Sequence, residues 1–282
     1  MTTISLINMK GGVGKTTLTI NLAHFLSERD NLKVLIVDID PQFNSTQCLF
    51  SGSEYVQYLK QNKDTIVNIF DDSVKSKLST VKGTQKEDAK ELKDIEPYHF
   101  SENLHILPGN LELYKLDMAS GTGREMRLKQ YLREINKKNN YDFVLIDTPP
   151  TPSVWMTSAL IASQYYLIPV KPDPISFVGI DLLENIIEQK RDSYDLSIKC
   201  IGLVMTMIDR IDSTIFRDAK AYVKRNKKWA PLLFKKHLPK RSEIAKLQLQ
   251  KQFILDCGNT DIKSALAGIV SELKTRLENE QE

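Results

Sequence analysis

The sequence predicts an α/β fold in which helices cover both faces of a doubly wound, mostly parallel sheet. Short apolar runs typical of strands alternate with helical patterns along the chain, which indicates right-handed βαβ units. The runs at 34–37 and 143–146 are apolar without interruption, as in strands that are buried on both faces. A glycine-rich segment, residues 10–17, joins the first apolar run to the first helical pattern. We expect a single domain over residues 1–282.

The strands are predicted from short apolar runs, with helical patterns in the intervals between them. In chain order these runs lie at residues 3–8, 33–38, 104–107, 142–147, 165–170, 199–206 and about 232–237. Residues 51–100 depart from this rhythm, because they are rich in Lys, Asp, Ser and Gln and have weaker apolar spacing. We interpret Lys82 to Asp94 as an exposed helix or loop excursion.

The last element is a helix that begins near Asp261 and carries apolar residues at helical spacing. Such a helix could lie on a membrane surface or pack on the sheet. Its end contains Glu272, Glu278, Glu280 and Glu282, which anionic lipids would repel. Packing on the sheet is therefore favoured.

The glycine-rich segment Lys10-Gly11-Gly12-Val13-Gly14-Lys15-Thr16-Thr17 predicts a nucleoside triphosphate site. Its glycines let backbone amides approach phosphate oxygens, and the helix that follows adds unpaired amides and the positive end of its dipole. Lys15 can reach the β- and γ-phosphates, and the Thr16 hydroxyl is placed to ligate Mg²⁺. The general pattern G-x-x-x-x-G-K-[ST] would need glycine where this chain has Met9, and a second lysine, Lys10, precedes the glycines.

Two predicted strands end in carboxylates. Strand 33–38 runs into Asp38-Ile39-Asp40-Pro41-Gln42, and strand 142–147 ends in Asp147-Thr148-Pro149-Pro150. Because the carboxyl ends of parallel strands meet at one edge of a sheet, these groups should lie beside the glycine-rich loop. Asp38 and Asp40 could instead simply cap a turn. Together with the two lysines, however, they favour a site for a Mg²⁺-nucleotide.

These three segments resemble motifs of the ParA/MinD/nitrogenase iron-protein class of ATPases. The loop is similar to its deviant Walker A motif, K-G-G-x-G-K-[ST], and the other two segments are similar to its D-x-D-P-Q switch I and D-x-P-P Walker B. The resemblance covers about residues 2–270, with 51–100 matched least. It implies a P-loop NTPase fold of the deviant Walker A type, with ATP and Mg²⁺ as cofactors.

The same resemblance implies roles for individual residues. Lys10 would reach across a nucleotide-sandwich dimer to the phosphates of the partner subunit. Asp147 would hold Mg²⁺ with Asp38 in support, and Asp40 would position or polarise the attacking water. Further residues would line the nucleotide pocket or flank the adenine, although apolar core residues would look the same at the last two positions: Gln42, Asn44, Met207 and Pro239.

A strongly basic window distinguishes among branches of this class. Between Lys220 and Lys251 there are eleven Lys and Arg residues against Glu243 alone, a net +10, whereas the whole chain carries +3 and the remainder therefore −7. Such a surface suits a polyanion, although an ordinary solvated face would have the same composition. The candidate DNA contacts are Lys224, Arg225, Lys227, Lys228, Lys235, Lys236, Lys240 and Arg241.

Other features weigh against the remaining branches. Cys48, Cys200 and Cys257 lie far apart, which offers neither a cluster nor a zinc site. The acidic tail lacks the basic amphipathic anchor of MinD-like proteins, and no apolar run approaches the roughly 18 residues of a membrane span. The chain therefore resembles a ParA/Soj-type partition ATPase most.

This resemblance implies a slow ATPase that forms homodimers with ATP and then binds double-stranded DNA without sequence preference. A ParB-type centromere-binding protein would stimulate hydrolysis. We expect a cytoplasmic, nucleoid-associated protein with no stable membrane association. The alternative is a MinD-like or cargo-positioning ATPase that acts on a membrane or a protein scaffold.

Overall fold

A computed structural model describes residues 1–70, 90–118 and 123–280 of the chain. Its centre is a seven-stranded sheet with the order β3-β4-β2-β5-β1-β6-β7, in which all neighbours are parallel except β3 and β4. The strands are β1 (Thr2–Leu6), β2 (Val34–Asp38), β3 (Tyr98–His99), β4 (Leu104–Leu107), β5 (Phe143–Asp147), β6 (Tyr165–Val170) and β7 (Lys199–Met205). The predicted doubly wound, mostly parallel sheet is thus confirmed.

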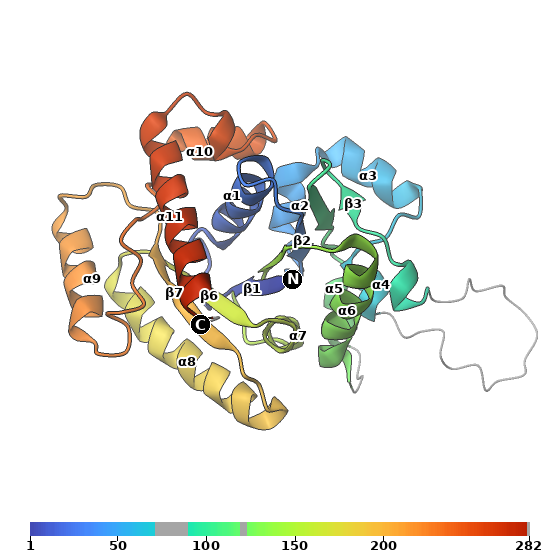
Figure 1. The fold of residues 1–282 in the computed structure, drawn as a ribbon, viewed down its shortest axis with the longest axis horizontal. Helices are drawn as coiled ribbons and strands as arrows, with labels where there is room; N and C mark the ends of the chain where they lie inside the picture. Colours follow the sequence, from blue (N-terminus) through green and yellow to red (C-terminus); the bar gives the residue numbers. More distant parts are fainter. Residues whose placement is uncertain (71–89, 119–122, 281–282) are drawn as a thin grey trace, which may run out of the picture.

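Helices lie on both faces of this sheet (Figure 1). Those of the described residues are α1 (Lys15–Glu28), α2 (Asn44–Leu49), α3 (Gly52–Lys60), α4 (Ile66–Phe70), α5 (Leu113–Met118), α6 (Arg127–Asn139), α7 (Val154–Ala162), α8 (Pro174–Tyr194), α9 (Thr214–Arg225), α10 (Ser242–Leu249) and α11 (Thr260–Asn279). Short 3₁₀ turns span Leu92–Asp94, Arg124–Met126 and Ile254–Asp256.

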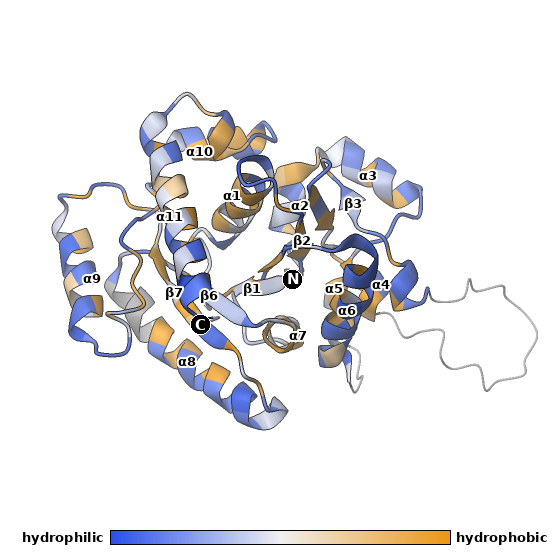
Figure 2. Ribbon diagram, in the orientation of Figure 1, coloured by the Kyte–Doolittle hydropathy of each residue, from blue (hydrophilic) through white to orange (hydrophobic). Residues whose placement is uncertain are grey.

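Alternate residues of the central strands supply two separate cores, because successive side chains of a strand point to opposite faces. In β2, Val34 and Ile36 pack in the core of α1, α10 and α11, whereas Leu35 and Val37 pack in the core of α4, α6 and α7. A third core joins β6 and β7 to α8 and α9. In Figure 2, α8 and α9 alternate between hydrophobic and hydrophilic residues along their length, as expected of helices with one buried face.

The C-terminal helix packs on the molecule as predicted. The apolar side chains of α11, among them Ile262, Leu266 and Ile269, are buried in the same core as α1 and the inner strands. In the described part of the chain, no helix combines the length and the apolar composition that a membrane crossing requires.

The strand predicted at 232–237 is wrong. Leu233 makes only an isolated bridge with Leu203 of β7, and the chain contacts β7 again at Leu238, whose amide donates to the carbonyl of Met205 (2.9 Å). The amide of Lys235 donates to the Glu272 carboxylate (2.8 Å) instead of a strand, and the guanidinium of Arg276 donates to the carbonyls of Leu232 and Leu233 (both 3.1 Å). Side chains of α11 thus bind backbone groups of residues 232–235, including the Leu232 carbonyl that also accepts from the amide of Leu203 in β7 (2.8 Å).

The region 51–100 begins with helices α3 and α4 and ends with the short antiparallel strand β3, which the sequence did not predict. Of the excursion expected at Lys82 to Asp94, residues 82–89 lie outside the described residues. Residues 90–94 are mostly exposed, in agreement with the interpretation of that part.

Candidate nucleotide site

The loop between β1 and α1 forms an open cradle at the carboxyl edge of the sheet. Gly12 and Gly14 have φ angles of +70° and +80°, which favour glycine, and a Cβ at Gly11 or Gly12 would meet nothing within 4 Å. No side chain caps the N-terminus of α1, so its first amides face the cradle without a capping partner. The arrangement suits an anion with several oxygens.

A pocket follows this cradle and brings together most of the predicted nucleotide contacts. Its lining residues are Gly11, Gly12, Val13, Gly14, Lys15, Thr16, Thr17, Asp40, Gln42, Asn44, Pro150 and Met207. Pro239 does not line it. That residue forms an isolated bridge with Ile208 and lines a neighbouring cavity with His237 and Arg241.

Lys15 lies buried at the base of the cradle. Its ammonium donates to the carbonyl oxygens of Asn8 (3.0 Å) and Lys10 (3.4 Å). Burial lowers the pKa of Lys15, and the negative charges of Asp147 and Asp40 oppose this shift. A buried ammonium that is held mainly by carbonyl dipoles would gain strongly from a phosphate oxygen, because an ionised acceptor makes the stronger hydrogen bond.

Two carboxyls stand side by side beneath the pocket, since Asp38 and Asp147 occupy paired positions of β2 and β5. One oxygen of Asp147 accepts from the hydroxyls of Thr16 (2.8 Å) and Ser45 (2.7 Å). One oxygen of Asp38 accepts from both the amide and the hydroxyl of Thr46 (2.7 Å each). The Oδ1 atom of each carboxyl is buried and has no hydrogen-bond partner.

The electrostatics of this pair favour a bound cation. Burial and the neighbouring Asp147 raise the pKa of Asp38 well above its ordinary value, and burial raises the pKa of Asp147 to about 6. The unpartnered oxygens therefore lie where two negative charges are costly and where a cation would be stabilised. In the described residues no group of three or more His, Cys, Asp or Glu side chains could hold a metal ion, so any metal here would need the Thr16 hydroxyl, water or phosphate as well.

Asp40 reaches the pocket from the segment after β2. It is 5% exposed, its carboxylate accepts from the amide of Gln42 (2.9 Å), and its carbonyl accepts from the amide of Phe43 (2.7 Å). Phe43 has a φ angle of +42°, so the chain turns sharply here before α2 begins. Burial raises the pKa of Asp40, with opposition from the Gln42 hydrogen bond and Lys15.

Lys10 does not line the pocket. Its ammonium forms an ion pair with the carboxylate of Asp173 (2.7 Å), which directly precedes α8, and its backbone amide donates to the side chain of Asn8 (2.8 Å). The conformation of this loop thus directs Lys10 away from the cradle that its own chain forms.

Several neighbours of the site were not among the predicted residues. Ser45 binds Asp147, and Thr46 binds Asp38 and also accepts from the amide of Gly109 (2.7 Å). A Cβ at Gly109 would lie 2.6 Å from Phe43 and 2.9 Å from Asp38, so only glycine fits there. Ser45 and Thr46 directly follow the D-x-D-P-Q segment and could have been found from it, whereas Gly109 carries no local signal.

The eight predicted DNA contacts are all exposed, but their surroundings differ. Lys228 is paired with Glu184 (2.9 Å), and Lys240 lies 3.4 Å from Asp209. Arg241 donates to the carbonyls of Asp209 and Lys240. Lys224 and Arg225 are in the last turn of α9.

Known proteins match both the sequence and the fold. The family described as AAA domain matches residues 1–200. The sporulation initiation inhibitor protein Soj of Bacillus subtilis is 33% identical over 210 residues, which are 73% of this chain and 72% of that protein.

Two solved structures share the fold over nearly their whole length. Apo McdA of Cyanothece superposes with a TM-score of 0.76 at 20% identity and covers 98% of this chain and 99% of its own. The putative plasmid partition protein of Borrelia burgdorferi B31, bound to AMPPNP, has a TM-score of 0.72 at 21% identity, with 99% and 98% coverage.

Proposed function

The chain belongs to the ParA/Soj family of partition ATPases, and on this premise we propose that it is an ATP-driven switch for DNA partition. ATP and Mg²⁺ would bind in the pocket, two chains would close over the nucleotides, and the dimer would bind duplex DNA without sequence preference. The observation that carries the proposal is the pair of unpartnered buried carboxyl oxygens beneath an open glycine cradle. We treat residues 1–282 as one functional domain.

The residues at the base of the pocket fit a Mg²⁺-nucleotide. Thr16 and Asp147 share a hydrogen bond, so these two side chains would hold the ion together, with Asp38 in support. When bound, Mg²⁺ neutralises phosphate charge and orients the terminal phosphoryl group. The amides of the cradle and the Lys15 ammonium would hold the phosphates themselves, and Gln42, Asn44 and Met207 would bound the rest of the nucleotide.

Hydrolysis would depend on Asp40. Its carboxylate lines the pocket and accepts from the Gln42 amide, and there it would position or polarise the attacking water. Lys10 would act on the phosphates of the partner subunit, since in its own chain it lies outside the pocket. We expect slow turnover in the isolated protein and acceleration by a ParB-type centromere-binding partner.

DNA binding would come from the exposed basic window. Phosphate contacts supply affinity without sequence information and weaken steeply as salt rises. Dimerisation places two such windows on one duplex, so that modest contacts combine into avidity. The resulting protein would be cytoplasmic and nucleoid-associated, with no stable membrane association.

The decisive experiment is binding to a random-sequence duplex with ATP, with ADP and without nucleotide, over a salt titration. We expect tight binding only with ATP and its loss at high salt. Lys15→Ala serves as the control, because without this ammonium the phosphates lose their buried cation and DNA binding should no longer respond to ATP. Binding that ignores nucleotide, or no binding, would contradict the proposal. ATP-dependent flotation with liposomes, without DNA affinity, would instead favour a membrane or scaffold role.

A further inference from the structure

We propose that the basic window divides into two kinds of cation: Lys228 positions the turn after α9, whereas Lys224, Arg225 and Lys227 contact DNA phosphates. The inference rests on the proposed DNA-binding function and specifies which residues of that surface touch the polyanion. It differs from the sequence prediction, in which Lys228 was itself a DNA contact.

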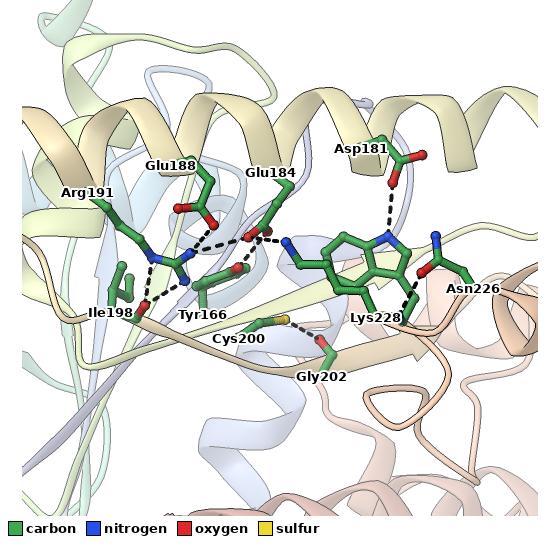
Figure 3. Close-up of polar contacts among 11 residues, drawn as sticks. Tyr166, Asp181, Glu184, Glu188, Arg191, Ile198, Cys200, Gly202, Asn226 and Lys228 are labelled. Atoms are coloured by element: carbon green, nitrogen blue, oxygen red, sulfur yellow. Dashed lines mark hydrogen bonds and ion pairs between the residues drawn. The ribbon is translucent and has the colours of Figure 1, made fainter.

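The turn after α9 is fastened to α8 at two points (Figure 3). Trp229 is 3% exposed, and its indole Nε1 donates to the carboxylate of Asp181 (3.0 Å). Next to it, the Lys228 ammonium donates to the carboxylate of Glu184 (2.9 Å), one turn further along α8. The side chain of Asn226 accepts from the amides of Lys228 (2.9 Å) and Trp229 (3.2 Å), which closes the turn.

Glu184 is buried, and hydrogen bonds from its partners stabilise its charge. It is 6% exposed, and besides Lys228 it accepts from the Tyr166 hydroxyl (2.7 Å) of β6 and from the Arg191 guanidinium (3.3 Å). Burial raises the pKa of Glu184, but the hydrogen bonds from Lys228 and Tyr166 outweigh it and leave the pKa below its ordinary value. Glu184 therefore stays ionised and keeps the ammonium of Lys228 close.

The side chain of Lys228 is 52% exposed, but its ammonium is held by protein partners. Its ammonium also lies 5.3 Å from the centre of the Trp229 ring, so the charge is shared between a carboxylate and an aromatic face. A cation that is already paired with a buried carboxylate gains little from a phosphate, and without neutralising that phosphate it releases no counterion from the DNA. Its contribution to DNA binding should be to hold the turn in place.

The neighbouring cations are in a different situation. Lys224, Arg225 and Lys227 are exposed, and no carboxylate of the described chain lies within ion-pair distance of them. They flank the fastened turn on the C-terminal side of α9. Each can therefore pair with a phosphate and release a counterion, which is the thermodynamic signature of a direct contact.

Salt dependence of DNA binding separates the two roles. We would measure affinity for a random-sequence duplex with ATP against salt concentration for the parent, Lys227→Met and Lys228→Met, which carry the same change of charge. Each lost phosphate contact reduces the slope of log K against log salt by about 0.9, so about 2 for a dimer with both copies changed. We expect this reduction for Lys227→Met and an unchanged slope for Lys228→Met.

A second readout reports the positioning role. Lys228→Met should weaken DNA binding several-fold at every salt concentration and speed amide exchange at residues 226–230, and Lys228→Arg, which restores the ion pair, should reverse both effects. A slope reduced equally by Lys228→Met and Lys227→Met would overturn this inference and leave the proposed function intact. No DNA binding by the parent protein would overturn the proposed function and the inference together.

Discussion

Asp38 and Asp147 illustrate how surroundings give one residue type two roles. Both carboxyls end neighbouring strands, yet Asp38 is tied to the backbone of α2 through Thr46, while Asp147 is tied to the first turn of α1 through Thr16. The contact between Asp38 and Thr46 links the carboxyl pair to the segment that carries Asp40. The contact between Asp147 and Thr16 links the pair to the phosphate cradle. Substitution of either aspartate should therefore alter both the proposed nucleotide site and the turn that holds Asp40.

Outside the site, His105 of β4 gives a prediction for stability against pH. It is 2% exposed, it shares a 2.6 Å hydrogen bond with the Tyr141 hydroxyl, and its ring stacks on His99. Burial, with the nearby positive charges of His99 and Lys33, lowers the pKa of His105 to about 4, from 6.5 in the unfolded chain. Between these values the unfolded state binds the extra proton, so stability falls as pH decreases.

The expected loss from His105 is about 3 kcal/mol over that interval, at 1.36 kcal/mol per unit of pKa shift. Urea unfolding at pH 7.5 and at pH 4.5 measures it. His105→Phe should show a smaller loss than the parent, whereas Tyr141→Phe, which keeps the imidazole, should retain most of the dependence. Equal pH dependence in the parent and His105→Phe would show that another group is responsible.

At the scale of elements, hydrogen bonds join α10 and the segment after it to α1, the helix that follows the glycine-rich loop. The side-chain amide of Gln248 donates to the Thr17 hydroxyl (3.0 Å), and a few residues later the amide of Ile254 donates to the side chain of Asn21 (2.7 Å). Thr17 lines the pocket, so this contact joins the phosphate loop to the basic segment around α10. The link is absent from any local sequence pattern, because the two partners are 231 residues apart.

Loss of the hydrogen bond between Gln248 and Thr17 should reduce the rise in unfolding temperature that ATP produces. A hydrogen bond of this kind contributes about 1 kcal/mol, and without it the Thr17 hydroxyl is no longer oriented. We expect Gln248→Leu to lower the unfolding temperature slightly and to shrink the further rise that ATP produces. Gln250→Leu is the matched control, since Gln250 is exposed at the end of α10. An unchanged ATP-induced rise in Gln248→Leu would refute the link.

Strands differ in how well the sequence predicts them. Buried strands such as 104–107 and 165–170 were predicted with their observed bounds, because a strand covered on both faces is mostly apolar, although β4 also buries His105. The edge is less predictable: residues 232–234 are apolar and make a single bridge with β7, but Glu272 and Arg276 of α11 also bind backbone groups of this segment, and no longer ladder forms. Such competition between distant partners has no local signal.

Some features of the site were likewise predictable from the sequence, and others were not. The carboxylates and the glycine loop were predictable because they occupy strand ends and a spaced motif, and the structure brings Asp40, Gln42 and Asn44 to one pocket. The pairing of Lys10 with Asp173 and of Lys228 with Glu184 was not, since each joins residues that meet only in the folded molecule. Charge counts located the basic window but could not distinguish solvated cations from paired ones.

At the scale of the whole molecule, α8 connects two surfaces. Asp173, just before this helix, holds Lys10 of the phosphate loop, and further along the helix Asp181 and Glu184 hold the turn after α9. The face that would meet a second subunit and the face that would meet DNA are thus both attached to α8 or to the residue directly before it. We therefore expect a shift of α8 during dimerisation to move the basic window as well.

Lys10 provides the test of assembly. Because its ammonium is paired with Asp173 and lies outside the pocket of its own chain, its loss should cost little affinity for ATP. If it acts on the partner's phosphates, its loss should instead prevent closure of the dimer. We expect sedimentation to show parent dimers with ATP, and Lys10→Ala to bind ATP yet remain monomeric and detached from DNA.

Lys15→Ala should be monomeric because it fails to bind nucleotide, so a nucleotide-binding assay separates the two defects. Normal ATP-dependent dimers of Lys10→Ala would refute the action of Lys10 across the interface.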